Sequence, residues 1–181
     1  KTVMSGPASG VMAAANAAKR AGINNLITYD MGGTSTDVAL VKDAIPAVSN
    51  ELDVEYAMPI HVPMVDVRTI GSGGGSIASI TDAGLLRVGP ESAGATPGPI
   101  CYGSGGDNPT ITDANLLLGR LNASKLLSTS DTPSLDKIRA IFDEKIASPL
   151  GIDVDQAAGA IIRVANDRMA GAVRIVSISK G

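Results

Sequence analysis

A glycine-rich turn between two short apolar runs is the feature that most constrains the fold of this chain. The runs, residues 26–29 and 38–41, are typical of buried strands, and the turn between them reads Asp30-Met-Gly-Gly-Thr-Ser-Thr-Asp37. The glycines carry no side chain and permit positive φ, so the backbone can approach an anion closely. We expect phosphate oxygens to be bound by the N–H groups and hydroxyls of Gly32, Gly33, Thr34, Ser35 and Thr36.

Two carboxylates flank this turn. Asp30 and Asp37 could hold a divalent cation or position a water beside it, so both are candidate catalytic residues, with Asp30 as the Mg²⁺ ligand. The alternative is an ordinary hairpin turn, in which Asp37 only satisfies N–H groups of the turn. One short turn rarely needs two glycines, three hydroxyls and flanking aspartates together, which favours phosphate binding. For Asp37 both interpretations stay open.

The composition excludes several classes of function. The chain has 181 residues, 44% of them hydrophobic and 18% charged, which fits one domain or a fragment with a sizeable core. A net charge of −3, no basic block and an aromatic content of 2% argue against a nucleic-acid partner. No signal peptide and no apolar run of membrane-spanning length is visible, and the lone Cys101 fits a reducing cytoplasm.

The order of the expected elements predicts an α/β domain with a mixed sheet. Hydrophobic periodicity predicts helices at 5–20, 112–121, 134–147 and 154–177, and strands at 25–30, 36–42, 45–49, 64–70, 77–80 and 85–88. The last two strands would form a hairpin. We expect Thr112 to cap the helix at 112–121, Leu121 to face inward, and Asp153 with Gln156 to start the last helix.

Two further segments are rich in glycine. Within residues 71–76, Gly73 and Gly74 are candidate nucleotide contacts, and the alternative is that another backbone packs there. Asp66 and Arg68 precede this segment and could face the same cleft or pair at the surface. Residues 89–109 are long for a structureless connection, and their prolines favour an ordered binding loop.

Other residues with reactive side chains favour structural roles. His61 is the only histidine and lies near prolines, where a surface or structural role is more common than catalysis. Cys101 is expected to be a small buried thiol and not a nucleophile. Asp113 and Asn115 open a helix, so capping is favoured over substrate contact. No His/Cys cluster has the spacing of a zinc site.

Taken together, these segments resemble a known family. The turn at 30–38 resembles a phosphate-binding hairpin of the actin/Hsp70/sugar-kinase superfamily of ATPases. More narrowly, the chain resembles the hydantoinase A/oxoprolinase family, with its N-methylhydantoinase A-like subunits. The supporting segments are Ser5-Gly-Pro-Ala-Ser-Gly10, residues 69–78, residues 89–103 and residues 109–121.

The resemblance implies an actin-like, ribonuclease H-like ATPase domain that uses ATP and Mg²⁺. It also implies the ATP-dependent opening of a small cyclic amide, a hydantoin or 5-oxoproline, by phosphorylation of the ring carbonyl oxygen. One alternative is a subunit of an ATP-dependent ketone carboxylase. Another is a non-catalytic actin-like module that only binds nucleotide.

The resemblance further implies that residues 1–181 are the middle part of a longer subunit. The first phosphate hairpin and the adenosine-binding segment of such a subunit are absent from this sequence, so the isolated piece is expected to be inactive or nearly so. Its partners would be the rest of its own chain and a hydantoinase B-type subunit. Uncovered sheet edges or faces would lead the isolated piece to self-associate.

Overall fold

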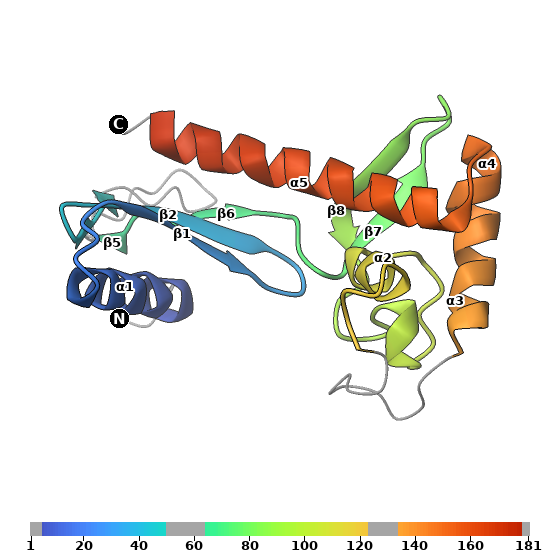
Figure 1. Ribbon diagram of the computed structural model, residues 1–181, viewed down its shortest axis with the longest axis horizontal. Helices are drawn as coiled ribbons and strands as arrows, with labels where there is room; N and C mark the ends of the chain where they lie inside the picture. Colours follow the sequence, from blue (N-terminus) through green and yellow to red (C-terminus); the bar gives the residue numbers. More distant parts are fainter. Residues whose placement is uncertain (1–4, 50–63, 123–133, 179–181) are drawn as a thin grey trace, which may run out of the picture. The chain divides into compact units, whose positions relative to one another are not determined.

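The computed structural model describes residues 5–49, 64–122 and 134–178, which form two compact units (Figure 1). Unit 1 comprises Lys1–Asp30, Asp37–Ile70 and Gly171–Gly181, and unit 2 comprises Met31–Thr36 and Gly71–Ala170. The tip of the predicted phosphate hairpin therefore belongs to unit 2, whereas the two aspartates that flank it belong to unit 1.

Unit 1 contains a small sheet with a helix packed against it. Strands β1 (Leu26–Met31), β2 (Thr36–Lys42) and β3 (Ile45–Pro46) lie in that order, and β6 (Arg68–Ile70) also pairs with β2. Strands β4 (Val48–Ser49) and β5 (Met64–Val65) form a separate antiparallel pair. Helix α1 (Ser5–Arg20) lies along one side of these strands (Figure 1). Its Val11 and Ala15 form a core cluster with Ala39 and Val41 of β2.

Unit 2 combines one hairpin with short helices. Strands β7 (Ser76–Ile80) and β8 (Leu86–Ser92) pair antiparallel, which confirms the predicted hairpin. The helical elements are η1 (Ile100–Tyr102), α2 (Ile111–Leu117), α3 (Leu135–Phe142), the π-helical η3 (Asp143–Ala147), α4 (Ser148–Leu150) and α5 (Val154–Ile178). Helix α2 packs against η1, β7 and α3. Of the loop expected at 89–109, the first four residues belong to β8 and residues 100–102 form η1, which packs against α2.

Helix α5 has the predicted boundaries and the predicted start. The Asp153 carboxylate accepts a hydrogen bond from the Gln156 N–H, and the Gln156 side chain accepts one from the Asp153 N–H. A stripe of small and apolar side chains along the helix is buried, including Ala158, Ile161 and Ala165. Within the described ranges, no helix combines the length and the apolar character that crossing a membrane requires.

Several expected boundaries were wrong. The strand expected at 64–70 is split into β5 and β6 because its two halves pair with different strands. β5 pairs with β4, a register that the 2.8 Å hydrogen bond from the Asp66 N–H to the Ala47 carbonyl extends, whereas β6 pairs with β2. The helix expected at 112–121 is α2, which starts one residue earlier and is capped by Thr110 instead of Thr112. Gly119 takes a positive φ of 70° just beyond it, so the helix cannot continue and Leu121 is exposed.

Candidate functional site

The tip of the β1–β2 hairpin presents unpaired backbone donors. The Gly32 N–H donates to the Ser35 carbonyl at 2.8 Å, which closes the turn. Within the described part of the chain, no acceptor faces the N–H groups of Gly33, Thr34 and Ser35, and Gly33 and Thr34 are exposed. Three successive N–H groups without an acceptor leave donors available to an anion, although neither Gly32 nor Gly33 takes a positive φ. Binding of phosphate oxygens by the tip stays a prediction.

The glycine-rich segment at 71–76 holds this tip in place. The Gly74 N–H donates to the Gly32 carbonyl at 3.0 Å, and the Gly75 N–H donates to the Gly33 carbonyl at 2.6 Å. A Cβ on Gly73 would lie 2.7 Å from both the Gly32 oxygen and the Ser35 nitrogen, so only glycine fits. The structure thus brings Gly73 and Gly74 to the tip by backbone packing, and their contact with a nucleotide stays a prediction.

Gly73→Ala is expected to destabilise the protein by about 1–3 kcal/mol, the usual cost of overpacking a tight site. The added methyl group would push against backbone atoms of the tip, which cannot give way as a flexible side chain can. The midpoint of urea unfolding measures this loss. Gly171→Ala in α5 is the matched control, because a Cβ there meets nothing within 4 Å. Equal midpoints for the two variants would contradict the prediction.

The Thr36 side chain joins the hairpin to the glycine-rich segment. Its Oγ1 is fully buried and donates to the Ser72 carbonyl at 2.6 Å. The Ser72 hydroxyl is buried too and has no hydrogen-bond partner among the described residues. The hydroxyl of Thr36 thus has an acceptor inside the protein, and its predicted contact with phosphate remains untested.

A cavity of about 250 Å³ opens beside the tip and lies entirely within unit 2. We call it the hairpin cavity, and its described lining consists of Gly33, Thr34, Gly75, Gly94, Ala95, Pro99 and Tyr102. None of these residues carries a formal charge. The predicted binding loop at 89–109 therefore supplies the wall that faces Gly33 and Thr34 across this cavity.

A buried carboxylate fixes this loop. The Asp113 side chain is fully buried and accepts hydrogen bonds from the N–H groups of Ile100, Cys101 and Thr110, at 3.2, 2.8 and 3.1 Å. It also accepts one from the Thr110 hydroxyl at 2.7 Å, and the two residues form a capping box for α2. The capping role predicted for Asp113 is confirmed. The same side chain holds residues 100 and 101 next to the hairpin cavity.

Burial raises the pKa values of two neighbouring side chains. Burial, with the Asp113 charge as a second cause, raises the pKa of the Cys101 thiol far above its usual value. The fully buried Cys101 therefore stays protonated and unreactive at neutral pH, which confirms the expected buried thiol. Burial also raises the pKa of the Tyr102 phenol, with smaller effects from Cys101 and Asp113, so its hydroxyl keeps its proton.

Asp30 and Asp37 line a second cavity, of about 300 Å³, within unit 1. Pro7 and Gly10 of α1 line the same cavity. The Asp37 carboxylate accepts a hydrogen bond from the Thr69 hydroxyl at 2.6 Å, which supports a structural role, while its catalytic role stays a prediction. Asp30 is exposed. Among the described residues no group of three or more metal-ligating side chains occurs, so a cation here would need waters or phosphate oxygens as further ligands.

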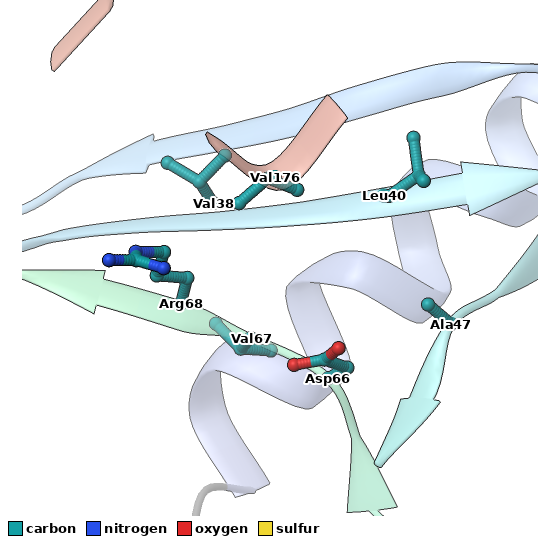
Figure 2. A pocket seen from close by; sticks show the side chains of 7 residues that line it. All are labelled: Val38, Leu40, Ala47, Asp66, Val67, Arg68 and Val176. Atoms are coloured by element: carbon teal, nitrogen blue, oxygen red, sulfur yellow. The ribbon is translucent and has the colours of Figure 1, made fainter. Parts of the chain in front are cut away.

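Asp66 and Arg68 line a third pocket, of about 210 Å³, also within unit 1. Figure 2 shows them with Val38 and Leu40 of β2 and with Val176 near the end of α5. The rest of the described lining is apolar. Both residues thus project into a pocket of unit 1. His61 lies outside the described residues.

Two residues of this region escaped sequence reasoning. Thr110 stands three residues before Asp113, a spacing typical of a capping box, so this pattern could have identified it. Tyr102 has no such pattern. Its place beside Gly33 and Thr34 depends on packing between segments about 70 residues apart in the chain.

Comparison with known proteins gives concordant results. A family model described as hydantoinase/oxoprolinase matches residues 1–181. The chain is 49% identical over 184 residues to the caprolactamase subunit alpha of Pseudomonas jessenii, covering 99% of the chain and 26% of that protein. It is 40% identical over 193 residues to the 5-oxoprolinase of Saccharomyces cerevisiae, covering 100% of the chain and 15% of that protein.

Solved structures agree with these matches. The crystal structure of the ATP-dependent caprolactamase of P. jessenii superposes with a TM-score of 0.87 at 48% identity, over 98% of this chain and 26% of that chain. A nucleotide-free structure of acetone carboxylase, from work on ATP-dependent acetone carboxylation, gives a TM-score of 0.88 at 30% identity, over 100% and 26%. The expected α/β, actin-like fold class is confirmed. The chain spans only about a quarter of the length of these two proteins.

Proposed function

Because the chain belongs to the hydantoinase/oxoprolinase family, we propose that it forms the phosphate-binding part of an ATP-dependent enzyme that opens a cyclic amide. One observation carries this proposal: the exposed hairpin tip, where the N–H groups of Gly33, Thr34 and Ser35 lack partners among the described residues. Phosphoryl transfer depends mainly on positioning and on charge stabilisation, and a rigid set of backbone donors serves both.

The proposed reaction consumes one ATP and two waters per ring. The carbonyl oxygen of the ring amide attacks the γ-phosphorus, and the bond from this phosphorus to the β,γ-bridging oxygen breaks as ADP leaves with the electron pair. The first water adds to the activated carbon, and the carbon–nitrogen bond breaks as the nitrogen takes up a proton. The second water releases inorganic phosphate from the resulting acyl phosphate.

Different residues bind the phosphates and the metal ion in this proposal. The N–H groups of residues 33–35, with the hydroxyls of Thr34 and Ser35, bind the β- and γ-phosphates. Asp30, which directly precedes the tip segment in the chain, holds Mg²⁺ through water, since Mg²⁺ keeps several waters and takes few protein carboxylates. The exposed Asp30 side chain leaves room for such a hydrated ion.

A second candidate function is supported by one of the solved structures. The fit to acetone carboxylase, with a TM-score of 0.88, allows the same phosphate-binding hairpin to serve an ATP-dependent carboxylase subunit. In that case the activated compound is a ketone and the product passes to a partner subunit. The caprolactamase relative is likewise a subunit. We propose a second, hydantoinase B-type subunit as partner and the cytoplasm as the site of action.

Release of ADP tests the proposal. Because the chain spans only 15% to 26% of the length of the relatives described above, the assay uses the full-length gene product with any partner subunit. The substrates are 2-pyrrolidinone, ε-caprolactam, hydantoin, 5-oxoproline, and acetone with bicarbonate. Stimulation by the ring compounds is expected. Stimulation by acetone alone would favour the carboxylase, and ATP binding with no stimulation by any compound would overturn both and leave a non-catalytic nucleotide-binding module.

A further inference from the structure

We propose that the hairpin cavity binds the carbonyl substrate, that it selects an electrically neutral lactam over an anionic one, and that Tyr102 is its hydrogen-bonding residue. This inference rests on the proposed function, because it places the substrate beside the phosphate-binding tip. It adds to that function a site, a binding residue and a class of substrate.

The hairpin cavity adjoins the phosphate-binding tip proposed above. Gly33 and Thr34 belong both to the tip with its free N–H groups and to the lining of the hairpin cavity. A phosphate held at the tip would therefore border any ligand in the cavity. Transfer of a phosphoryl group requires its acceptor oxygen within about 3–3.5 Å of the phosphorus, and a shared wall can provide this proximity.

Tyr102 has a hydroxyl that is available to a ligand. Nothing in the described part of the chain hydrogen-bonds its hydroxyl, although the side chain is half-buried. A Cβ on Gly98 would lie 3.0 Å from the Tyr102 ring, so the ring packs closely on this glycine. A protonated phenol can donate to a carbonyl oxygen and accept from an amide N–H, which are the polar groups of a lactam.

Backbone hydrogen bonds fix the turn that carries Tyr102. The Asp113 carboxylate accepts hydrogen bonds from the N–H groups of Ile100 and Cys101, directly before Tyr102 in the chain. The Gly103 N–H donates to the Ile100 carbonyl at 3.1 Å and closes the turn after it. The phenol is therefore held in position before a ligand arrives, which lowers the entropy cost of binding.

The charge and the size of the hairpin cavity favour a small neutral ligand. The described lining of the hairpin cavity offers no cation, so a ligand carboxylate would have no partner of opposite charge there and would be repelled by phosphates held at the tip. A volume of about 250 Å³ is below the range of roughly 300–1,000 Å³ typical of sites for drug-sized ligands. A small neutral lactam meets both the charge requirement and the size requirement of the cavity. 5-Oxoproline fails the charge requirement because it carries a carboxylate.

A matched pair of substrates tests the selectivity, because 2-pyrrolidinone is 5-oxoproline without its carboxylate. With the full-length protein, we expect kcat/KM for ADP release to be at least about tenfold higher with 2-pyrrolidinone or ε-caprolactam than with 5-oxoproline. Tyr102→Phe is expected to raise KM for the neutral lactams about tenfold and to leave the Kd for ADP unchanged. Folding should be unaffected, since this hydroxyl has no described partner.

A second pair of variants tests the cavity itself. Ala95→Val narrows the hairpin cavity and is expected to raise KM more for ε-caprolactam than for the smaller 2-pyrrolidinone. Ala83→Val, in the exposed turn between β7 and β8, is the control and should change neither value. Activity with 5-oxoproline equal to or above that with 2-pyrrolidinone, or an unchanged KM in both Tyr102→Phe and Ala95→Val, would overturn the inference while the proposed function stands. Failure of every carbonyl compound to stimulate ADP release would remove both.

Discussion

Replacing Asp113 with alanine is expected to lower the free energy of unfolding by about 3–5 kcal/mol. The change removes the acceptor of four hydrogen bonds, three from backbone N–H groups and one from the Thr110 hydroxyl. The site is fully buried, so water cannot replace the lost carboxylate without reopening the loop. Each buried donor left unpaired costs about 1–3 kcal/mol. Urea unfolding of the full-length protein measures the effect.

A second aspartate serves as the control for this experiment. Asp155 pairs with Arg139 at 2.9 Å on the surface, and exposed ion pairs contribute about 0–1 kcal/mol. Asp155→Ala should therefore shift the unfolding midpoint little. Asp113→Asn keeps the size of the side chain and one acceptor oxygen. We expect its unfolding midpoint to lie between those of Asp113→Ala and Asp155→Ala. A midpoint for Asp113→Ala as high as that for Asp155→Ala would refute the anchoring role.

Asp30→Ala is expected to reduce lactam-stimulated ADP release about 100-fold or more, because the proposed metal would lose its protein carboxylate. The variant should fold normally, since Asp30 is exposed. The Mg²⁺ concentration that gives half-maximal rate should rise as well. This second readout separates loss of the metal ligand from a general loss of activity.

Asp82→Ala provides the comparison for Asp30, because Asp82 is an exposed carboxylate in the turn between β7 and β8. It removes the same charge from a place with no assigned role, so rate and Mg²⁺ dependence should stay at the level of the unmodified protein. If Asp30→Ala behaves in the same way, the metal assignment is wrong. The phosphate-binding role of the tip would still stand on its backbone donors.

Local sequence patterns predicted the elements that depend on neighbouring residues. The β7–β8 hairpin follows from two apolar runs around a short turn, and helix α5 follows from its periodic stripe and the Asp153–Gln156 pair. The Asp30–Asp37 segment was also predicted to form a hairpin turn, and the structure has β1 and β2 on either side of it. Its phosphate chemistry stays a prediction. These features need no knowledge of distant contacts.

Features that depend on distant segments were not predictable in the same way. The sequence left open whether Gly73 contacts a nucleotide or a backbone, and only the structure shows the tip packed against it. The interruption of the strand at 64–70 depends on a change of pairing partner, from β4 for β5 to β2 for β6. Tyr102 lines the hairpin cavity, and the residue directly before it is held by a hydrogen bond to Asp113 of helix α2. In each case the structure depends on a contact with a residue that is not a neighbour in the sequence.

At the hairpin tip, backbone carbonyls are hydrogen-bonded within the protein, whereas several backbone N–H groups are not. The carbonyls of Gly32 and Gly33 accept hydrogen bonds from the N–H groups of Gly74 and Gly75, while the N–H groups of residues 33–35 have no partner among the described residues. Residues 31–36 include no lysine or arginine, so a positive electrostatic face at the tip would come from peptide dipoles. Such a face does not titrate, cannot be acetylated away and survives replacement of the Thr34 or Ser35 side chain. Evolution can alter it only by changing the path of the main chain itself.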